Sequence, residues 1–474
     1  MLNKFSFLYF ILIGSLTQAQ INTEWTINLI DSTYLASTID DQENIYQVVS
    51  YYQTGIGNGI SIQKYDKNGV LKWSVPFEIE NAFSYELADI VIDNNNNVAA
   101  AIIASGYTDA NFYVTKYDSG GNQLWSRSDP YTISFGFNYN SSLAVDNNDN
   151  IFLSSSVAGS TTGYPFPNPT YSDFINFLIV KYDSSGTEQW SRIYDGPSGL
   201  MDIPRDMVID DAGNVYVTGI SEKIDSIDYN NYWMYKSTGV STIKYNSAGT
   251  LEWVDYLPNS DVSDIEIDNS GFVYVVGASG TSGYLSNFMA AKFNFNGSRI
   301  WVKNFSKNQL NLQSYVSSVA IDDYGNVFVT GYEDHPTNYP YNNIHTIKYD
   351  ISGTEKWDKI IENVWITSSV NSEKLKVVVS NSGNVYVHGY LRDEGTGYDG
   401  GIIKYDTDGN VLWELIENPT HTSHLKIANS GFLYVTRYNQ LTKYRDEEVS
   451  EEKFPPTNLS YDFDTHSLRW NKSL

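Results

Sequence analysis

Cysteine is absent from this chain of 474 residues, and histidine is scarce, with six residues. Without cysteine the fold has no disulfide staples, so packing alone must hold it together. Basic residues are also few, because 30 lysines and arginines stand against 56 aspartates and glutamates, for a formal net charge of −26. This balance argues against a nucleic acid or an anionic lipid surface as the partner.

What the chain has in abundance is a repeated pattern of aspartate, glycine and aromatic residues. The pattern K-[YF]-[DN]-x-x-G-x-x-x-W keeps glycine five residues and tryptophan nine residues after the lysine. It starts at Lys64, Lys116, Lys181, Lys244, Lys292, Lys348 and Lys404. Because Asp or Asn can bond the backbone two residues on and glycine accepts a positive φ, each copy predicts a tight turn between two strands. The tryptophan falls in the second strand, where its ring can fill the space between stacked sheets.

A second motif, I-D-x-x-G-N-V-Y-V, lies upstream of each lysine. Its copies start at Ile39, Ile92, Val145, Ile209, Ile267, Ile321, Val379 and Ile427. Apolar alternation on both sides of the Asx/Gly turn is typical of a β-hairpin. One repeat therefore predicts four strands, named a, b, c and d, with the I-D turn joining a to b and the K-Y-D turn joining c to d.

The repeats begin and end out of phase. A lone d strand around Trp25 precedes the first complete repeat, and the last repeat ends with a c strand at Tyr444. The tryptophans of the d strands are Trp25, Trp73, Trp125, Trp190, Trp253, Trp301, Trp357 and Trp413. Since four-stranded sheets must stack to bury their faces, we predict an all-β propeller of eight four-stranded blades, with seven as the alternative. The strand around Trp25 would close the ring by pairing with the C-terminal a-b-c hairpins.

The ends of the chain differ in composition from the repeats. Residues 1–19 carry a lysine, an apolar core and a small-x-small site, which predict a signal peptide and hence export to the medium or cell surface; the core is too short for a membrane span. The propeller is expected over residues 20–445, and residues 446–454 form a charged linker. Residues 455–474 look like the first two strands of a fibronectin type III domain, cut short.

The paired motifs over about residues 22 to 444 resemble the bacterial "seven-bladed β-propeller repeat" family of exported proteins. This resemblance implies a secreted or surface-exposed propeller with no established enzymatic activity, although eight repeats depart from the family name. A weaker similarity links the turns to quinoprotein repeats. Those repeats have a different Asp-to-Gly spacing, and their enzymes use adjacent cysteines, so no quinone or other cofactor is expected here.

Strand direction indicates where a binding surface would lie. The repeated a-b and c-d turns must share one rim, so the variable b-c and d-a connections share the other, and binding residues are usually on variable loops. Aromatic residues are frequent there, as on many recognition surfaces. The candidate binding residues are Tyr164, Phe166, Tyr171, Tyr229, Tyr232, Trp233, Tyr339, Tyr341 and Tyr398. The alternative is that these rings merely pack the loops onto each other.

The a strands, which should line the channel, provide a second candidate site. Four residues before the I-D aspartate position, the repeats place Ala36, Asp89, Ser142, Asp206, Asp264, Ser318, Lys376 and His424. We expect these residues to form a layer near the loop-rich mouth of the channel. Asp89, Asp206, Asp264, Lys376 and His424 could bind a ligand or transfer protons, or could simply solvate the channel.

No metal site is expected. The Asp/Asn-rich turns, such as residues 146–150, do not provide the D-x-D-x-D-G run and distal Glu of an EF-hand loop. We therefore expect a monomeric, non-enzymatic scaffold for binding or adhesion, whose partners are proteins or glycans. One alternative is a secreted glycan hydrolase or lyase that uses carboxylates such as Asp206 and Asp264. The other is an assembly scaffold for envelope proteins.

Overall fold

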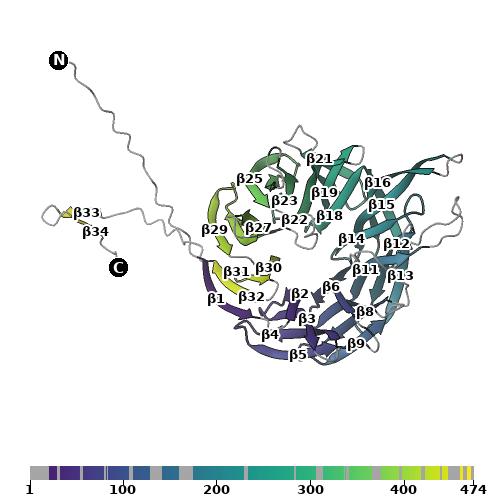
Figure 1. The fold of residues 1–474 in the computed structure, drawn as a ribbon, viewed down its shortest axis with the longest axis horizontal. Coiled ribbons are helices and arrows are strands. Elements are labelled where there is room, and N and C mark those ends of the chain that lie inside the picture. Colours follow the sequence, from purple (N-terminus) through teal and green to yellow (C-terminus); the bar gives the residue numbers. More distant parts are fainter. Residues whose placement is uncertain are drawn as a thin grey trace, which may run out of the picture.

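The computed structural model describes residues 21–28, 32–53, 57–79, 82, 84–105, 110–128, 141–159, 174–228, 233–281, 284–305, 313–335, 337, 341–365, 375–393, 398–417, 422–437, 440–446, 459–462 and 467–470. Over these ranges the secondary structure consists of β-strands joined by tight turns and loops. Figure 1 shows the strands as a ring of sheets around a central axis.

Eight four-stranded antiparallel sheets make up the ring, and each is one blade. Blades 1 to 4 are β2 (Ser32–Ile39), β3 (Ile45–Gln53), β4 (Gly57–Tyr65), β5 (Leu71–Phe77); β6 (Ser84–Ile92), β7 (Val98–Ser105), β8 (Ala110–Tyr117), β9 (Gln123–Ser128); β10 (Ser142–Val145), β11 (Ile151–Ala158), β12 (Ile175–Tyr182), β13 (Glu188–Tyr194); and β14 (Asp202–Ile209), β15 (Val215–Asp228), β16 (Trp233–Tyr245), β17 (Leu251–Pro258). Blades 5 to 8 are β18 (Ser260–Ile267), β19 (Val273–Thr281), β20 (Tyr284–Phe293), β21 (Arg299–Phe305); β22 (Ser314–Ile321), β23 (Val327–Asp334), β24 (Tyr341–Tyr349), β25 (Glu355–Trp365); β26 (Lys376–Val379), β27 (Val385–Asp393), β28 (Tyr398–Tyr405), β29 (Val411–Glu417); and β30 (Thr422–Ile427), β31 (Phe432–Arg437), β32 (Gln440–Asp446), β1 (Ile21–Asn28).

The ring closes through blade 8, which combines the two ends of the repeat array. β1 pairs antiparallel with β32, in a register that runs from Ile21 opposite Asp446 to Asn28 opposite Gln440. Figure 1 shows β1 at the start of the colour scale beside the C-terminal strands β31 and β32. The prediction of eight blades closed by the strand around Trp25 is confirmed, and the seven-blade alternative is wrong.

The core lies between adjacent blades. The b and c strands are the most deeply buried; all eight residues of β12, for example, are buried. The interface between blades 1 and 2 packs Val48, Ile62 and Phe77 against Ile90 and Ile102. The d strands face outward and alternate exposed and covered residues, as in β5 and β9. Each blade therefore buries its two faces against its neighbours, which explains why the repeat needs a closed ring.

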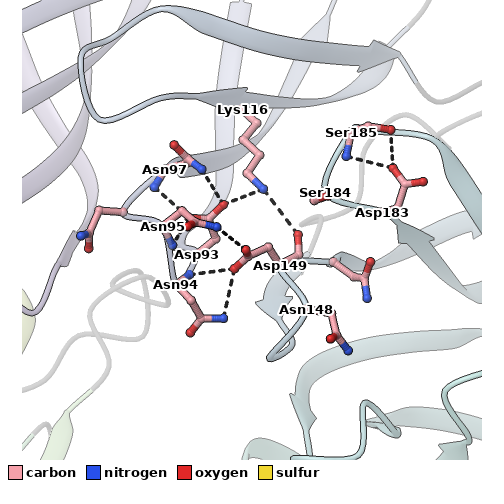
Figure 2. Close-up of polar contacts among 12 residues, drawn as sticks. Asp93, Asn94, Asn95, Asn97, Lys116, Asn148, Asp149, Asp183, Ser184 and Ser185 are labelled. Atoms are coloured by element: carbon pink, nitrogen blue, oxygen red, sulfur yellow. Dashed lines mark hydrogen bonds and ion pairs between the residues drawn. The ribbon is translucent and has the colours of Figure 1, made fainter.

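The c-d turns follow the predicted chemistry. In blade 3 the Oδ1 atom of Asp183 accepts the backbone N–H groups of Ser185 at 2.9 Å and Thr187 at 3.0 Å, and Figure 2 shows the Asp183–Ser185 contacts. Gly186 has a φ of +79°, and a Cβ atom there would lie 2.5 Å from Cδ2 of Trp125 in the preceding blade. Glycine is therefore required twice, for the backbone conformation and for the approach of the indole.

Each tryptophan of the repeat fastens its blade to the next one. Seven indole N–H groups donate to the carbonyl of the residue that follows the turn Asp or Asn of the neighbouring blade, at 3.0 to 3.4 Å. The pairs are Trp25 with Lys67, Trp73 with Ser119, Trp125 with Ser184, Trp190 with Ser247, Trp253 with Phe295, Trp301 with Ile351 and Trp357 with Thr407. At most of these interfaces the repeat lysine donates to the same carbonyl, as Lys64 does to Ser119 at 3.1 Å.

The interface between blades 7 and 8 uses a side chain instead. Blade 8 has no c-d turn, because its c and d strands come from opposite ends of the array. Asp446, the last residue of β32, supplies the acceptors: it bonds Trp413 Nε1 at 3.0 Å, Lys404 Nζ at 2.6 Å and the Tyr386 hydroxyl at 2.5 Å. Its carboxylate thus replaces the turn carbonyl at the seam of the ring.

The a-b turns share this rim and also bond to each other. Asn94 in blade 2 donates from its backbone N–H to Asp149 Oδ1 in blade 3 at 2.9 Å, and Asn95 Nδ2 donates to Asp149 Oδ2 at 2.5 Å. Beneath them Lys116 and Asp93 form an ion pair at 2.7 Å, with each side chain 1% exposed (Figure 2). The rim formed by the a-b and c-d turns, called the turn rim here, is therefore held by repeated polar contacts.

The opposite rim carries the b-c and d-a connections and is called the loop rim. Here β15 and β16 continue as a hairpin, paired out to Asp228 opposite Trp233, and Figure 1 shows this hairpin extending outward from the ring. Outside the ring, β33 (Leu459–Asp462) and β34 (Ser467–Trp470) pair with each other as a two-stranded sheet.

Candidate functional site

The aromatic candidates of the loop rim fall mostly outside the described residues. This holds for Tyr164, Phe166, Tyr171, Tyr229, Tyr232 and Tyr339. The backbone of Trp233 and Tyr398 lies in β16 and β28, but their side chains are not described. Tyr341, the first residue of β24, is half-buried. The binding role of these residues stays a prediction.

The channel layer is built by the a strands, which line the axis of the ring (Figure 1). In six of the eight a strands the pairing with strand b shifts register immediately before the layer residue, as between Leu87 and Asp89 or Val262 and Asp264. In the other two, β10 and β26, the strand begins at the layer residue, Ser142 or Lys376. A bulge at this point re-aims the side chain that follows it. His424 occupies the layer position of β30, but its side chain is not described.

Two aspartates of the layer fasten adjacent blades. Asp89 Oδ2 accepts the backbone N–H of Leu143 in the next blade at 2.8 Å, and Asp264 Oδ2 accepts that of Val319 at 3.0 Å. Asp89 also accepts the N–H of Ile90 at 2.7 Å. Burial still raises the pKa of Asp89, despite these bonds. Part of the layer is therefore structural, since its oxygens satisfy backbone donors at the axis.

Asp206, Asp264 and Lys376 form a charged group at the centre of the layer. Lys376 Nζ lies 3.7 Å from Asp264 Oδ2, and 36% of the Lys376 side chain is exposed within the channel. Burial and the neighbouring Asp264 carboxylate raise the pKa of Asp206 well above its usual value. Burial opposes ionisation of Asp264 as well, but the Lys376 ammonium and a hydrogen bond from Asp206 lower its pKa. Of the two carboxyl groups Asp206 has the higher pKa, so Asp206 is the donor and Asp264 the acceptor in the hydrogen bond between them.

Two further charged residues point into the channel and were missed by the sequence reasoning. Glu266 and Lys426 lie two residues after the layer positions of blades 5 and 8, on the same strand faces as the layer. Their spacing from the layer is the signal that could have found them. Burial, then the Asp264 carboxylate, raises the pKa of Glu266 to about 7. Burial lowers the pKa of Lys426.

These residues line a cavity of about 630 Å³. Its walls include the layer residues Asp89, Asp206, Asp264 and Lys376, and it continues past Glu266 and Lys426 to the a-b turns of blades 1 and 2. A second cavity of about 480 Å³ shares Glu266 and Lys426 and reaches the a-b turns of blades 5 and 6. Both cavities extend from the layer toward the turn rim.

A second buried charged group lies within blade 6. His345 donates from Nδ1 to Asp358 Oδ1 at 3.1 Å and from Nε2 to Glu333 Oε1 at 3.0 Å. Burial alone would lower the pKa of His345, but the hydrogen bonds to Asp358 and Glu333 and their negative charges raise it to about 9. At neutral pH the imidazole is therefore charged and both ring nitrogens are occupied, which suits a structural bridge rather than proton transfer.

The described residues contain no group of three or more His, Cys, Asp or Glu side chains arranged to hold a metal ion. Within the same ranges, no helix is long and apolar enough to cross a membrane.

Comparison with known proteins places the fold but not the activity. No protein-family model and no curated protein matches the chain. Among solved structures, the chain is similar to the Dos1 propeller, with a TM-score of 0.54 and 10% identity, over 90% of this chain and 95% of that one. It is also similar to Drosophila Plexin A in its complex with Semaphorin 1b, with a TM-score of 0.43 and 10% identity, over 96% of this chain and 94% of that one. A protein of unknown function from Dyadobacter fermentans matches with a TM-score of 0.40 and 11% identity, over 78% of this chain and 96% of that one.

This chain is an eight-bladed β-propeller. At 10% identity the likeness to the Dos1 propeller concerns the fold alone. The function must therefore be argued from the surfaces and the channel described above.

Proposed function

We propose that this propeller is an exported, non-enzymatic scaffold that binds a protein or glycan partner through its loop rim. The observation that carries this proposal is the difference between the two rims. The turn rim repeats the same contacts from blade to blade, while the loop rim bears an individual hairpin that extends beyond the ring. A rigid frame with one irregular rim is the usual arrangement of binding loops on a scaffold.

The base of the β15–β16 hairpin is held by its neighbours, which favours recognition without a large ordering cost. The backbone N–H of Ile224 donates to Ser198 Oγ at 2.9 Å, and that of Glu222 donates to the Met201 carbonyl at 2.9 Å, both in the loop that enters blade 4. Across the hairpin Lys236 Nζ pairs with Glu222 Oε2 at 3.1 Å. The backbone beyond these contacts carries the predicted binding residue Trp233.

Export and surface exposure are part of the same proposal. They are supported by the signal-like composition of residues 1–19 and by the resemblance of the two motifs to exported bacterial propeller repeats. A fibronectin-like segment after residue 454 fits a modular surface protein in the same way.

The glycan-active alternative has a specific observation against it. Asp206 and Asp264 are in hydrogen-bonding contact with each other, whereas the two carboxyl groups of a glycosidase are usually about 5 to 9.5 Å apart, with the bond to be cleaved between them. The Asp264 carboxylate is further engaged by Val319 and Lys376. An assay of glycan cleavage with wild type and Asp206→Asn decides this alternative: cleavage that the substitution abolishes would favour the enzyme.

The scaffold proposal is tested by shortening the hairpin. Replacing residues 225–235 by Asn-Gly joins Ile224 to Lys236, which face each other in the ladder, and keeps the contacts of Ile224, Glu222 and Lys236 at the base of the hairpin. The matched control is Phe295→Ser, an exposed residue on the turn rim. On arrays of glycans and of purified surface proteins, the shortened protein should lose the binding that wild type and control retain. Equal binding by all three would refute the loop rim as the binding surface, and protein-only binding would favour the envelope scaffold.

A further inference from the structure

The channel contains a carboxylate, Glu266, and an ammonium group, Lys426, that form no direct ion pair with another described side chain. In the described residues, Lys426 Nζ makes no direct hydrogen bond or ion pair with a protein group. Glu266 accepts only the backbone N–H of Ile267, its own neighbour in sequence. Both side chains line both cavities of the channel. They therefore differ from the layer above them, whose charges are satisfied by each other and by backbone donors.

The layer residues Asp89, Asp206, Asp264 and Lys376 line the same cavity as Glu266 and Lys426. The ion pair between Asp264 and Lys376 and the hydrogen bond that the Val319 N–H donates to Asp264 hold the central charges in place. Within the layer the Lys376 ammonium offsets the negative charge of the Asp264 carboxylate. A ligand in the cavity thus meets the polar layer and, beyond it, two groups of opposite charge that attract each other through space but form no direct ion pair.

The size and charge of the cavity restrict the ligand. A volume of about 630 Å³ lies within the range of small-molecule sites, about 300 to 1,000 Å³. A simple anion that pairs with Lys426 would be repelled by Glu266 and by Asp89, and a simple cation that pairs with Glu266 would be repelled by Lys426. A ligand that carries both charges can form a charge-assisted contact with each group, which a ligand with a single charge cannot do.

We propose that the turn-rim half of the channel binds a small zwitterion of the amino-acid class, with its ammonium group on Glu266 and its carboxylate on Lys426. This site is separate from the loop rim and does not depend on the function proposed for it. It opens toward the a-b turns of blades 1 and 2, so a partner on the loop rim would not cover it.

The test uses a series of zwitterions that differ in the separation of their charges: glycine, β-alanine, 4-aminobutyrate and 6-aminohexanoate. Butyrate and butylammonium, which each lack one charge, are the matched probes. Binding is measured by isothermal titration and by the shift in melting temperature of the full-length protein. At least one zwitterion should bind about tenfold or more tightly than either single-charge probe, because a charge-assisted contact contributes roughly this factor.

Variants identify the two anchors. Lys426→Met and Glu266→Gln should each weaken the best zwitterion about tenfold or more. Lys356→Met and Glu188→Gln make the same charge changes outside the channel and should leave affinity unchanged. Since neither Lys426 nor Glu266 bonds another side chain, their variants should keep the melting temperature of the free protein.

Any of three results would overturn the site. The first is that no zwitterion in the series binds or shifts the melting temperature. The second is that Lys426→Met and Glu266→Gln bind the best zwitterion as wild type does. The third is a lower melting temperature of both variants without any ligand, which would show that the two groups stabilise the ring directly.

Discussion

Asp446 is the residue whose replacement tests the closed ring most specifically. Its carboxylate accepts Trp413 Nε1, Lys404 Nζ and the Tyr386 hydroxyl, and the Asp446 and Lys404 side chains are each 3% exposed. Asp446→Ala leaves the Lys404 ammonium buried without its partner. Breaking a buried ion pair by removing one member costs about 3 to 5 kcal/mol.

This free energy can be converted into a melting temperature. An unfolding entropy of about 2.1 cal/mol/K per residue, over a ring of roughly 420 residues, gives about 0.9 kcal/mol/K. Asp446→Ala should therefore lower the melting temperature by about 3 to 6 °C if the ring unfolds as one unit. Calorimetry measures this shift, and hydrogen exchange should show that β1 and β32 lose protection before the other strands.

The control is Asp408→Asn, which removes a charge from an exposed position in the c-d turn of blade 7. It should leave the melting temperature unchanged, because exposed charges contribute little. The double variant Asp446→Ala with Lys404→Met should recover part of the loss, since no ammonium is then left unpaired. An Asp446→Ala protein that melts like wild type, with β1 still protected, would refute the role assigned to this carboxylate.

Three further predictions concern the turns, blade 6 and the channel. Gly297→Ala should destabilise the protein by about 2 to 4 kcal/mol, because an added Cβ would meet the indole of Trp253. Gly271 also has a φ of +79°, but nothing lies within 4 Å of an added Cβ, so Gly271→Ala should cost about 1 to 2 kcal/mol. Equal losses of stability in urea unfolding would contradict the packing of Gly297 on the indole. The pKa of His345 is raised from 6.5 to about 9, so its contribution to stability is complete below about pH 6.5 and is lost as pH rises through 9. In urea titrations, the difference in unfolding free energy between wild type and His345→Gln should therefore shrink over this pH range. A difference that grows with pH would exclude the charged bridge. Burial and the neighbouring Asp264 carboxylate raise the pKa of Glu266 to about 7, so binding of a zwitterion should weaken as pH falls from 8 to 6; titration calorimetry that finds constant affinity would argue against Glu266 as the ammonium partner.

The sequence was most informative where structure is local. The Asx/Gly turns, the four-strand repeat and the phase of its two ends depend on residues a few positions apart, and the structure confirms all three. The spacing of the a strands also grouped Asp206, Asp264 and Lys376 correctly, because side chains four residues before equivalent turns share one level of the channel.

The rest depended on contacts between blades, which the repeat does not encode. Asp446 is the first residue of the segment predicted as a charged linker. Its role as acceptor for Trp413 follows only from the missing c-d turn of blade 8. Glu266 and Lys426 were overlooked because each occurs in one repeat only. The shape of the cavity depends on packing across the axis, which the spacing of residues along one strand does not reveal.

A designed disulfide at the seam is the most direct measurement of the central claim, that the two ends of the chain share blade 8. Thr26 and Thr442 are partners in the β1–β32 ladder, with their Oγ1 atoms 3.2 Å apart, and the natural sequence contains no cysteine that could compete. Under oxidising conditions the double variant Thr26→Cys, Thr442→Cys should form an intramolecular bond in monomeric protein, with no free thiol and a higher melting temperature that reduction reverses. Two free thiols after oxidation, or cross-linked dimers only, would show that the ring is not closed by these strands.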